Sequence, residues 1–263
     1  MRTAICFYGL VGSITDKSGN GKTLDPKIAY ELNKTNVIDI NNADVFIHSW
    51  SFDSKNELEE LYKPKSSIVE KQKDFPDSLK ILSNINFKQK IKEIFLRFFN
   101  NKEYESIITL RKKEAFRAFS RWYSNKQTLK LKEDYEAKHN FKYDAVLVSR
   151  LDVAFYKTLD MKNYDLSKFY ASHWNDYPTK NNEFKMNFKN HNRGKGFLDF
   201  WFFSNSQNMD KFGVLYDEID KYQISPHISS FQHAKSNKFN IDYTFYRWQD
   251  HEMIRRKKFL AIK

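Results

Sequence analysis

Cysteine is almost missing from this chain of 263 residues, which contains Cys6 alone. A single cysteine excludes an intramolecular disulfide and a zinc site built from cysteines. Long apolar runs are also missing, since no stretch approaches the roughly 18 residues that a membrane-spanning helix needs. The chain enters a strand-like segment directly after Met1-Arg2, without the charged, apolar and cleavage regions of a signal peptide. We therefore expect a soluble, cytoplasmic protein.

Familiar catalytic signatures are missing too. The sequence has no GxSxG elbow and no HExxH helix, and Cys6 lies inside an expected buried strand. Hydrolysis through a covalent nucleophile or a zinc ion is therefore disfavoured. The glycine-containing loop after the first strand matches neither GxGxxG nor the Walker pattern, so it predicts no particular phosphate-binding fold by itself.

Acidic residues are outnumbered, because 45 Lys and Arg face 33 Asp and Glu and leave a net charge of +12. Such a surplus gives affinity for nucleotides, nucleic acid or an anionic membrane surface. It can equally reflect a composition rich in Lys, Asn, Ile, Phe and Tyr, as AT-rich codon usage would produce. The charge is scattered in short clusters such as residues 111–113 and 255–258, and no nucleic-acid-binding motif accompanies it. A non-enzymatic basic module that binds nucleic acid or an anionic membrane stays as the alternative to an enzyme.

The chain does contain an alternation of strand-like and helix-like segments. Apolar runs indicate strands at residues 3–8, 43–50, 143–153, 169–174, 197–204 and 241–246. Helical spacing indicates helices at 26–33, 57–62, 87–138, 226–235 and from Ser206, the expected N-cap, to 219. Residues 63–84 are interpreted as irregular. The pattern predicts a single α/β domain over 1–263, with a mostly parallel central sheet flanked by helices and a helical insertion at about 87–138.

The most informative segment is the apolar run 145–148, which ends at Arg150 and Asp152. A continuous Val- and Leu-rich run suits a strand buried on both faces of a parallel sheet. Ligands of open α/β sheets bind beyond the carboxyl ends of the strands, where this pair would lie on one side of the backbone. Arg can clamp a phosphate with two hydrogen bonds, and Asp can hold a divalent cation or a sugar hydroxyl. The pair predicts a site for a phosphorylated ligand.

Three further charged residues allow two interpretations each. Asp199 lies inside an apolar strand, where an acid is costly to bury unless it is paired or functional. It is either a general base or acceptor-binding group, or a strand-edge acid bonded to backbone amides. Arg117 and Arg121 are one helical turn apart and form either part of a site or a solvated charged face.

Histidines and one long polar segment complete the candidates. His251 is either a metal ligand or phosphate contact, or a surface histidine, and His48 at a strand exit has the same alternatives. Residues 174–196 are polar and almost without periodicity, as is typical of a lid over a site, and His173 and His191 flank or lie within this segment.

Several segments together carry a resemblance to a known family. They are Phe7-Tyr8-Gly9-Leu10-Val11-Gly12-Ser13, Asn42-Ala43-Asp44-Val45-Phe46-Ile47-His48-Ser49-Trp50, Tyr123-Ser124-Asn125-Lys126, Lys142-Tyr143-Asp144 with Ser149-Arg150-Leu151-Asp152, and the aromatic strand that contains Asp199. In this order they resemble the glycosyltransferases of bacterial and viral capsule and lipopolysaccharide clusters, which are similar to the GT-A class of nucleotide-sugar transferases. The resemblance covers nearly the whole chain.

The resemblance implies a hexosyltransferase-type enzyme that moves a sugar from a nucleotide-sugar donor to a glycan or lipid-linked glycan. The basic tail, residues 253–263, either docks the cytoplasmic protein on the anionic inner face of the membrane, where lipid-linked acceptors lie, or is a solvated end. It implies Asp199 and Arg150 as catalytic residues, and Asp152 and His251 as ligands of Mg²⁺ or Mn²⁺. It also implies that the donor is bound by Phe7, Tyr8, Gly9, Ser13, Asp44, His48, Arg150 and Asp152.

Two departures from the family pattern bear on these roles. Arg150 occupies the place of the first acid in the DxD element, so the diphosphate charge can be neutralised partly by Arg. Gly12 occupies the place where many relatives have Arg in the first loop, which weakens the expected phosphate contact there.

Overall fold

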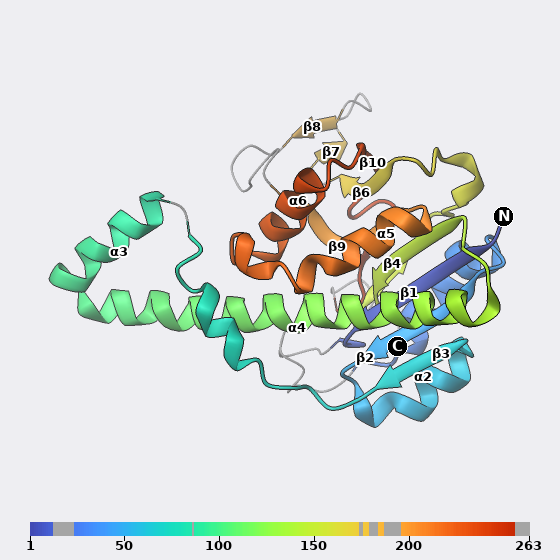
Figure 1. The fold of residues 1–263 in the computed structure, drawn as a ribbon, viewed down its shortest axis with the longest axis horizontal. Helices are drawn as coiled ribbons and strands as arrows, with labels where there is room; N and C mark the ends of the chain where they lie inside the picture. The colour runs from blue at the N-terminus through green and yellow to red at the C-terminus, as the bar shows by residue number, and fades with distance from the viewer. Residues whose placement is uncertain (13–23, 86, 174–175, 179–183, 187–195, 256–263) are drawn as a thin grey trace.

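The computed structural model describes residues 1–12, 24–85, 87–173, 176–178, 184–186 and 196–255. A seven-stranded sheet runs through its centre in the order β10-β6-β9-β4-β1-β2-β3 (Figure 1). The strands are β1 Thr3–Gly9, β2 Asp44–Ser49, β3 Ser66–Val69, β4 Ala145–Arg150, β6 Phe169–His173, β9 Leu198–Ser204 and β10 Ile241–Tyr246. Strand β9 is antiparallel to its neighbours β4 and β6, and the other pairings in this sheet are parallel.

Helices cover both faces of this sheet (Figure 1). They are α1 Lys27–Asn33, α2 Lys55–Tyr62, α3 Phe87–Phe99, α4 Asn101–His139, α5 Ser206–Gly213 and α6 Pro226–Ser236. One apolar core lies between the sheet and α4, α5 and α6, and a second lies on the side of α1 and α2. The predicted α/β fold with a mostly parallel sheet flanked by helices is confirmed.

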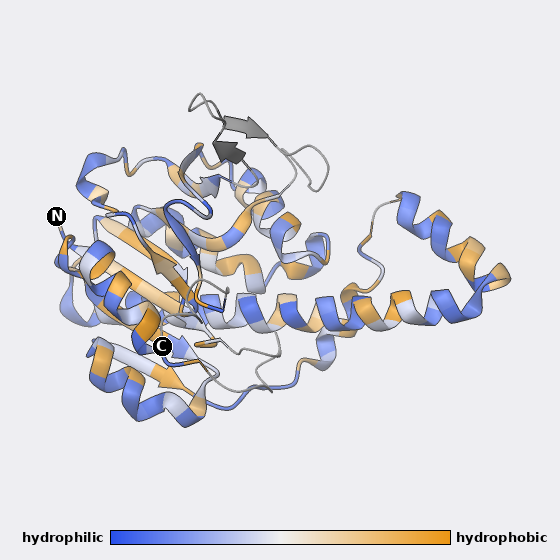
Figure 2. Cartoon of the chain, turned by 180° about the vertical axis from the view of Figure 1, so that it is seen from behind, coloured by the Kyte–Doolittle hydropathy of each residue, from blue (hydrophilic) through white to orange (hydrophobic). Residues whose placement is uncertain are grey.

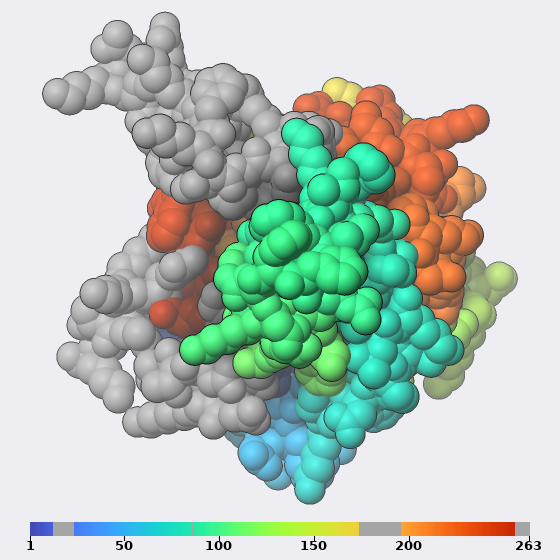
Figure 3. Space-filling model, turned by 90° about the vertical axis from the view of Figure 1, so that its left-hand side faces the viewer, coloured from blue at the N-terminus to red at the C-terminus, as the bar shows by residue number. Residues whose placement is uncertain are grey.

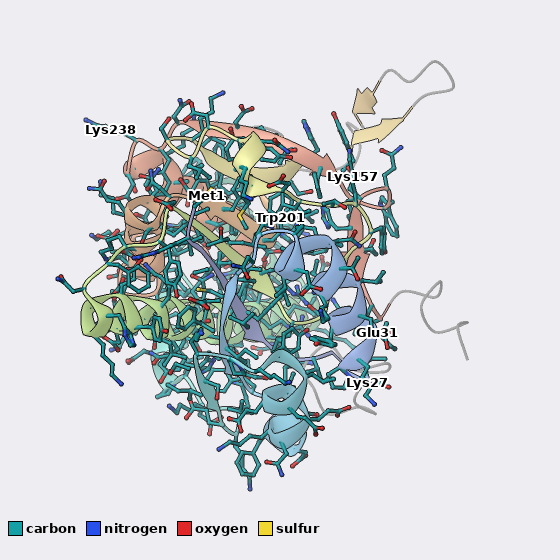
Figure 4. The ribbon with its side chains drawn as sticks, turned by 90° about the vertical axis from the view of Figure 1, so that its right-hand side faces the viewer. Met1, Lys27, Glu31, Lys157, Trp201 and Lys238 are labelled. Carbon is teal, nitrogen blue, oxygen red and sulfur yellow. The ribbon has the colours of Figure 1, made fainter. Side chains whose placement is uncertain are left out.

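Strand β1 shows why a continuous apolar run is needed at the centre of such a sheet. Its alternating side chains enter both cores, Cys6 and Tyr8 on the α4 side and Ile5 and Phe7 on the α2 side. The same burial holds for Trp201 of β9, which lies within the packed interior, whereas Lys157 and Lys238 lie at the outer edge (Figure 4).

Two small sheets complete the strands of the described residues. Strand β5 Val153–Phe155 pairs antiparallel with β11 His251–Met253, and β7 Asp176–Pro178 pairs antiparallel with β8 Phe184–Met186. Within the part of the chain that the structure describes, no helix has the length and apolar character needed to cross a membrane.

Helix α4 is far longer than the sheet that it packs against. Its N-cap Asn100 accepts a hydrogen bond from the Glu103 backbone N–H at 3.2 Å, and Asn140 ends it in the left-handed conformation with φ of 52°. Helix α3 and residues 101–110 of α4 extend beyond the sheet, and we call them the arm (Figure 1). These helices occupy the range of the predicted insertion, and a single domain over 1–263 stays a prediction.

Two local predictions are wrong. Residues 63–84 are not all irregular, because they contain β3 and a 3-10 helix at Pro76–Ile81. Strand β3 has only four residues at the sheet edge, too few to show an alternating pattern. The N-cap of α5 is Asn205 rather than Ser206, since the Asn205 side chain accepts from the Asn208 backbone N–H at 2.8 Å.

Candidate functional site

The carboxyl ends of three parallel strands form one edge of the sheet. In the register of the sheet Gly9 lies beside Ser49, and Tyr8 lies beside Arg150. A cavity of about 470 Å³ opens at this edge, with walls that include Tyr8, Gly9, Trp50, Arg121, Arg150 and His227. Its volume lies in the range of small-molecule sites, and its position is where open α/β sheets bind ligands. We call it the edge pocket.

The first loop reaches the edge pocket with two glycines in left-handed conformations, Gly9 with φ of +91° and Gly12 with φ of +103°. A Cβ atom on Gly12 would lie 3.0 Å from Leu24 Cδ1 and 3.3 Å from Asp152 Cβ. The loop therefore packs closely on Asp152, and a larger side chain at position 12 would be strained. Tyr8 and Gly9 line the pocket as predicted residues of the site, and Ser13 lies outside the described residues.

Arg150 and Asp152 are brought together at the end of β4. Arg150 Nε lies 2.7 Å from Asp152 Oδ1, and Arg150 Nη2 lies 2.5 Å from Oδ2. Burial alone would lower the pKa of Arg150, but the charge and hydrogen bonds of Asp152 outweigh burial and raise the pKa. Both residues line the edge pocket, so a charged guanidinium is held there in one orientation.

The expected metal site is not assembled in this arrangement. Both carboxylate oxygens of Asp152 already accept from Arg150, and His251 does not line the edge pocket. His251 is buried in β11, with its Nε2 at 2.7 Å from Ser172 Oγ. Among the described residues no three His, Cys, Asp or Glu side chains are grouped as metal ligands. The side chains around Asp152 therefore do not fit a Mg²⁺ or Mn²⁺ ion held by the protein.

Asp199 lies beneath the pocket rather than in its wall. Its buried carboxylate forms an ion pair with Arg121, and its Oδ1 lies 3.1 Å from His227 Nδ1. Arg121 and His227 line the pocket, whereas Asp199 does not. The carboxylate therefore faces two side chains of the pocket rather than backbone amides, and its role as a general base or acceptor-binding group stays a prediction.

The charges around the pocket do not balance. Burial and the nearby Arg121 lower the pKa of His227 to about 4, so this histidine is neutral at neutral pH. Burial and the charge of Arg150 lower the pKa of Arg121 to about 9, which leaves it protonated. Four arginines line the pocket, namely Arg117, Arg121, Arg150 and Arg255. They face three acids, which are Glu114 and Asp152 of the pocket and the adjacent Asp199, so one positive charge remains. The surplus favours an anionic ligand. Arg121 lines the pocket as a partly buried side chain, whereas Arg117 lines it and is exposed to solvent, so both interpretations of this pair hold in part.

Two residues predicted to bind the donor lie elsewhere. Phe7 points into the core on the opposite face from Tyr8, where its ring centroid lies 5.0 Å from that of Tyr62. Asp44 is the first residue of β2, at the amino edge of the sheet, and its Oδ2 accepts from the Tyr143 hydroxyl at 2.7 Å. Neither lines the edge pocket, and both predictions are corrected.

His48 supports the pocket without lining it. Its buried ring lies with Nδ1 at 2.7 Å from Ser124 Oγ and Nε2 at 3.2 Å from Glu70 Oε1. The Gly9 backbone N–H donates to the same Ser124 hydroxyl at 2.9 Å. His48 therefore helps to fix the first loop through Ser124, which corrects its expected contact with the donor.

Sequence reasoning missed His227, Trp50 and Arg255 as residues of the pocket. His227 follows Pro226 at the start of α6, a position that gives no pattern beyond a helix start. Trp50 follows β2 and stacks on Tyr123 with ring centroids 5.6 Å apart. Its place beside His48 at a strand exit was the available signal for it.

The predicted lid at 174–196 falls mostly outside the described residues, apart from β7, β8 and residue 196. His191 is also outside them. His173 ends β6, where its ring stacks on Tyr246 with centroids 4.2 Å apart, and it does not line the edge pocket.

Comparisons with known proteins give weak likenesses. No family model and no curated protein sequence matches this chain. Among solved structures, a protein of Desulfovibrio desulfuricans G20 described as a nucleotide-diphospho-sugar transferase is 9% identical with a TM-score of 0.36, covering 94% of this chain and 81% of that chain.

Two further structures have similar values. A nucleoside-diphosphate-sugar pyrophosphorylase of Vibrio cholerae RC9 is 9% identical with a TM-score of 0.44, covering 98% of this chain and 97% of that one. A CTP:phosphocholine cytidylyltransferase of Streptococcus pneumoniae is 11% identical with a TM-score of 0.43, covering 98% and 95%. Likenesses this weak do not assign an activity, so the residues of the edge pocket must carry that inference.

Proposed function

We propose that this protein is a hexosyltransferase-type glycosyltransferase, which moves a sugar from a nucleotide-sugar donor to a surface glycan of the capsule or lipopolysaccharide kind. The observation that carries the proposal is the arginine-lined edge pocket, in which Arg150 is fixed by Asp152 at the carboxyl end of the central strand. A diphosphate offers the negative charge and the acceptor oxygens that such a cluster binds. In the resemblance to GT-A transferases, the segment 149–152 occupies the place of the DxD element, with Arg150 in place of its first acid.

The nucleoside has a place beside the arginines. A second hollow, of about 240 Å³, shares Leu10, Gly12 and Trp50 with the edge pocket and continues to Phe52 and Lys71. An indole or phenyl ring gives a nucleobase a face on which to stack. We propose that the base lies in this hollow and the diphosphate lies against Arg150 and Arg121.

Catalysis by this pocket rests on charge. Breaking the bond between sugar and diphosphate places negative charge on the leaving group, and oriented cations stabilise that charge in the transition state. Arg150 and Arg121 supply two such cations, and the start of α6 at Pro226 and His227 adds the positive end of a helix dipole. Because the acids around Asp152 do not fit a bound cation, we expect donor binding to persist in a metal chelator.

His227 is the proposed base for the acceptor hydroxyl. Its Nδ1 lies 2.9 Å from the Phe197 carbonyl oxygen, which accepts a hydrogen bond, and 3.1 Å from the carboxylate oxygen Oδ1 of Asp199. These partners assign the proton to Nδ1 and the lone pair to Nε2. A bound diphosphate would bring negative charge close to the ring and raise its pKa from about 4, which strengthens it as a base. Asp199 is then a positioning residue for His227 and Arg121.

The test is to identify the products. The protein is incubated with sugar nucleotides and glycan acceptors, and phosphorus NMR follows the nucleotide released. We expect a nucleoside diphosphate together with an extended glycan, loss of both in Arg150→Met, and retention of both in Lys138→Met, which removes an equal charge from the exposed end of α4 far from the pocket. Release of pyrophosphate or a nucleoside monophosphate would indicate a phosphoryl-type transferase, and no turnover of any donor that binds would overturn the proposal.

A further inference from the structure

The arm exposes large apolar side chains that nothing in the described chain covers. Phe87, Phe98 and Phe99 of α3 are 75%, 78% and 74% exposed. Figure 2 colours much of α3 as hydrophobic, although this helix lies outside the layers of the sheet and its covering helices. Single exposed apolar residues are ordinary, but a contiguous set on one element marks a binding surface.

Helix α3 arranges these residues as one stripe between two rows of cations. At 3.6 residues per turn Phe87, Ile91, Ile94, Phe95 and Phe98 fall within about 100° of the helix circumference. The exposed cations lie on both flanks of this stripe, Lys88 and Lys92 on one side and Lys90 and Arg97 on the other.

The opposite side of α3 is the one that packs on α4. Leu96 is buried there, and Glu93 Oε2 lies 2.9 Å from Arg111 Nη1 of α4. Glu93, the one acid of α3, is therefore neutralised within the arm. Lys92 lies 3.5 Å from Glu103 of α4, so the helix presents its apolar stripe outward with Lys88, Lys90 and Arg97 beside it. Viewed from the tip, α3 and the start of α4 stand at the front of this face of the molecule (Figure 3).

We propose that α3 lies in the surface of an anionic phospholipid membrane, with its apolar stripe among the acyl chains and its flanking lysines and arginine on lipid phosphates. An apolar stripe with cations on both flanks is the pattern of a helix that lies in a bilayer interface. A second copy of the chain fits less well, because pairing two such stripes would bring the rows of cations together. The membrane offers both the hydrocarbon and the negative charge.

The arm also joins this surface to the edge pocket. Leu110, at the base of the arm, is 63% exposed and lines the pocket, together with Glu114 and Arg117 one turn and two turns along α4. The arrowheads of β1, β2 and β4 point toward the side from which the arm extends (Figure 1). Membrane docking needs no transfer reaction, but under the proposed function it would bring the pocket to lipid-linked acceptors.

Vesicle sedimentation tests the docking without any sugar substrate. The protein is mixed with vesicles of phosphatidylcholine alone or of phosphatidylcholine with phosphatidylglycerol. We expect binding to the anionic vesicles only, weakened by salt because the surface charges are screened. Lys90→Gln/Arg97→Gln should weaken it about 25-fold, at about fivefold per cation. The matched pair Lys55→Gln/Lys138→Gln, exposed on α2 and at the far end of α4, should leave it unchanged.

A second set of variants tests the apolar stripe. Phe98→Ser should weaken vesicle binding by about tenfold or more, since a buried Phe contributes at least about a factor of ten. Leu79→Ser, an exposed apolar residue of the 3-10 helix before the arm, is the matched control and should bind as the native protein does. Circular dichroism of each variant confirms that the helices are intact.

A probe on the arm separates insertion from self-association. Cys6 is fully buried and burial raises the pKa of its thiol to about 12, so an introduced surface cysteine can be labelled selectively. An environment-sensitive dye on Phe98→Cys should shift to shorter wavelength on adding anionic vesicles, and the same dye on Lys138→Cys should not. Equal binding to neutral and anionic vesicles, or an arm-dependent dimer with no vesicle binding, would overturn the proposal.

Discussion

The two ends of the sheet-packed part of α4 carry buried charges in different ways. Toward the arm, Arg121 pairs with Asp199 beside an open pocket whose arginines outnumber its acids. Toward the C-terminus of the helix, Lys132 and Glu136 are fully buried and bonded to each other at 3.0 Å. The first cluster has room and charge for a ligand, whereas the second is closed.

The closed cluster is satisfied within the protein. Lys132 Nζ also donates to Ser206 Oγ at 2.7 Å and pairs with Asp210, and Glu136 Oε1 accepts from the Tyr143 backbone N–H at 2.9 Å. Lys142 adds the second cation, so two lysines face two acids. Buried charges are stable when their partners are complete. The cluster of Arg121 and Asp199 beside the edge pocket is therefore the one to test for a ligand.

The largest expected effect is on the closed cluster. Lys132→Met leaves Glu136 and Asp210 without their central cation, so the free energy of unfolding should fall by about 3–5 kcal/mol. Urea unfolding of the native protein and of Lys132→Met measures this free energy. Lys130→Met is the matched control, because Lys130 is exposed with Asp134 at 2.9 Å and its pair should contribute about 1 kcal/mol or less. Equal losses in the free energy of unfolding in both variants would show that the buried cluster stabilises the fold no more than an exposed ion pair does.

The open cluster should respond in affinity rather than in stability. Arg150→Met/Asp152→Asn removes both charges of the pair together and avoids leaving one of them buried alone. Calorimetric titration should show about 100-fold weaker binding of a nucleoside diphosphate, the loss expected for charge-assisted hydrogen bonds to phosphate. Arg97→Met controls for net charge. Unchanged affinity in the double variant would show that the Arg150–Asp152 pair does not contribute to binding of the nucleoside diphosphate.

His48 makes the supporting network sensitive to pH. Burial lowers its pKa in the folded chain to about 4, in spite of its bond to Glu70, whereas the unfolded chain has a pKa of about 6.5. Between these values the unfolded chain binds a proton that the folded chain excludes, so the free energy of unfolding falls as the pH falls.

From pH 7 to about 5 the contribution of His48 to this fall should be about 2 kcal/mol. His48→Gln should remove that part of the pH dependence in urea unfolding, while His139→Gln, at the exposed end of α4, should not. His227 acts in the same direction and is present in both variants. Identical pH slopes for the native chain and His48→Gln would contradict the buried, neutral state of this histidine.

The smallest expected effect is on the stability of the arm. Phe98→Ser should change the free energy of unfolding by less than about 0.5 kcal/mol, because the ring is exposed. Phe202→Ala, which empties a fully buried site in β9, should cost about 3–5 kcal/mol. A large loss in Phe98→Ser would mean that the stripe packs within the protein in solution, which would also remove the basis for membrane docking.

The sequence predicted the fold class and the short-range part of the site. Arg150 and Asp152 are two residues apart on one strand end, so local geometry was enough to place them together. The alternation of β1 would also have separated Tyr8, which lines the pocket, from Phe7, which does not, but the resemblance assigned both residues to the donor.

Other parts of the site depend on tertiary contacts that a local pattern does not contain. Asp199, Arg121 and His227 come from β9, α4 and the start of α6, and only the packing of these elements brings them together. His48 was predicted to contact the donor because it lies at a strand exit, but its ring contacts Ser124, which comes from α4.

Thermal stabilisation by nucleotides tests the central claim most directly. The native protein is heated with a panel of nucleoside diphosphates and sugar nucleotides, each with and without Mn²⁺. A ligand at 100 times its Kd should stabilise the fold by about 2.7 kcal/mol. The account predicts a raised Tm with one nucleoside diphosphate and its sugar derivative, in the presence of a chelator as well, and no rise in Arg150→Met/Asp152→Asn. No rise with any nucleotide in the folded native protein would contradict it.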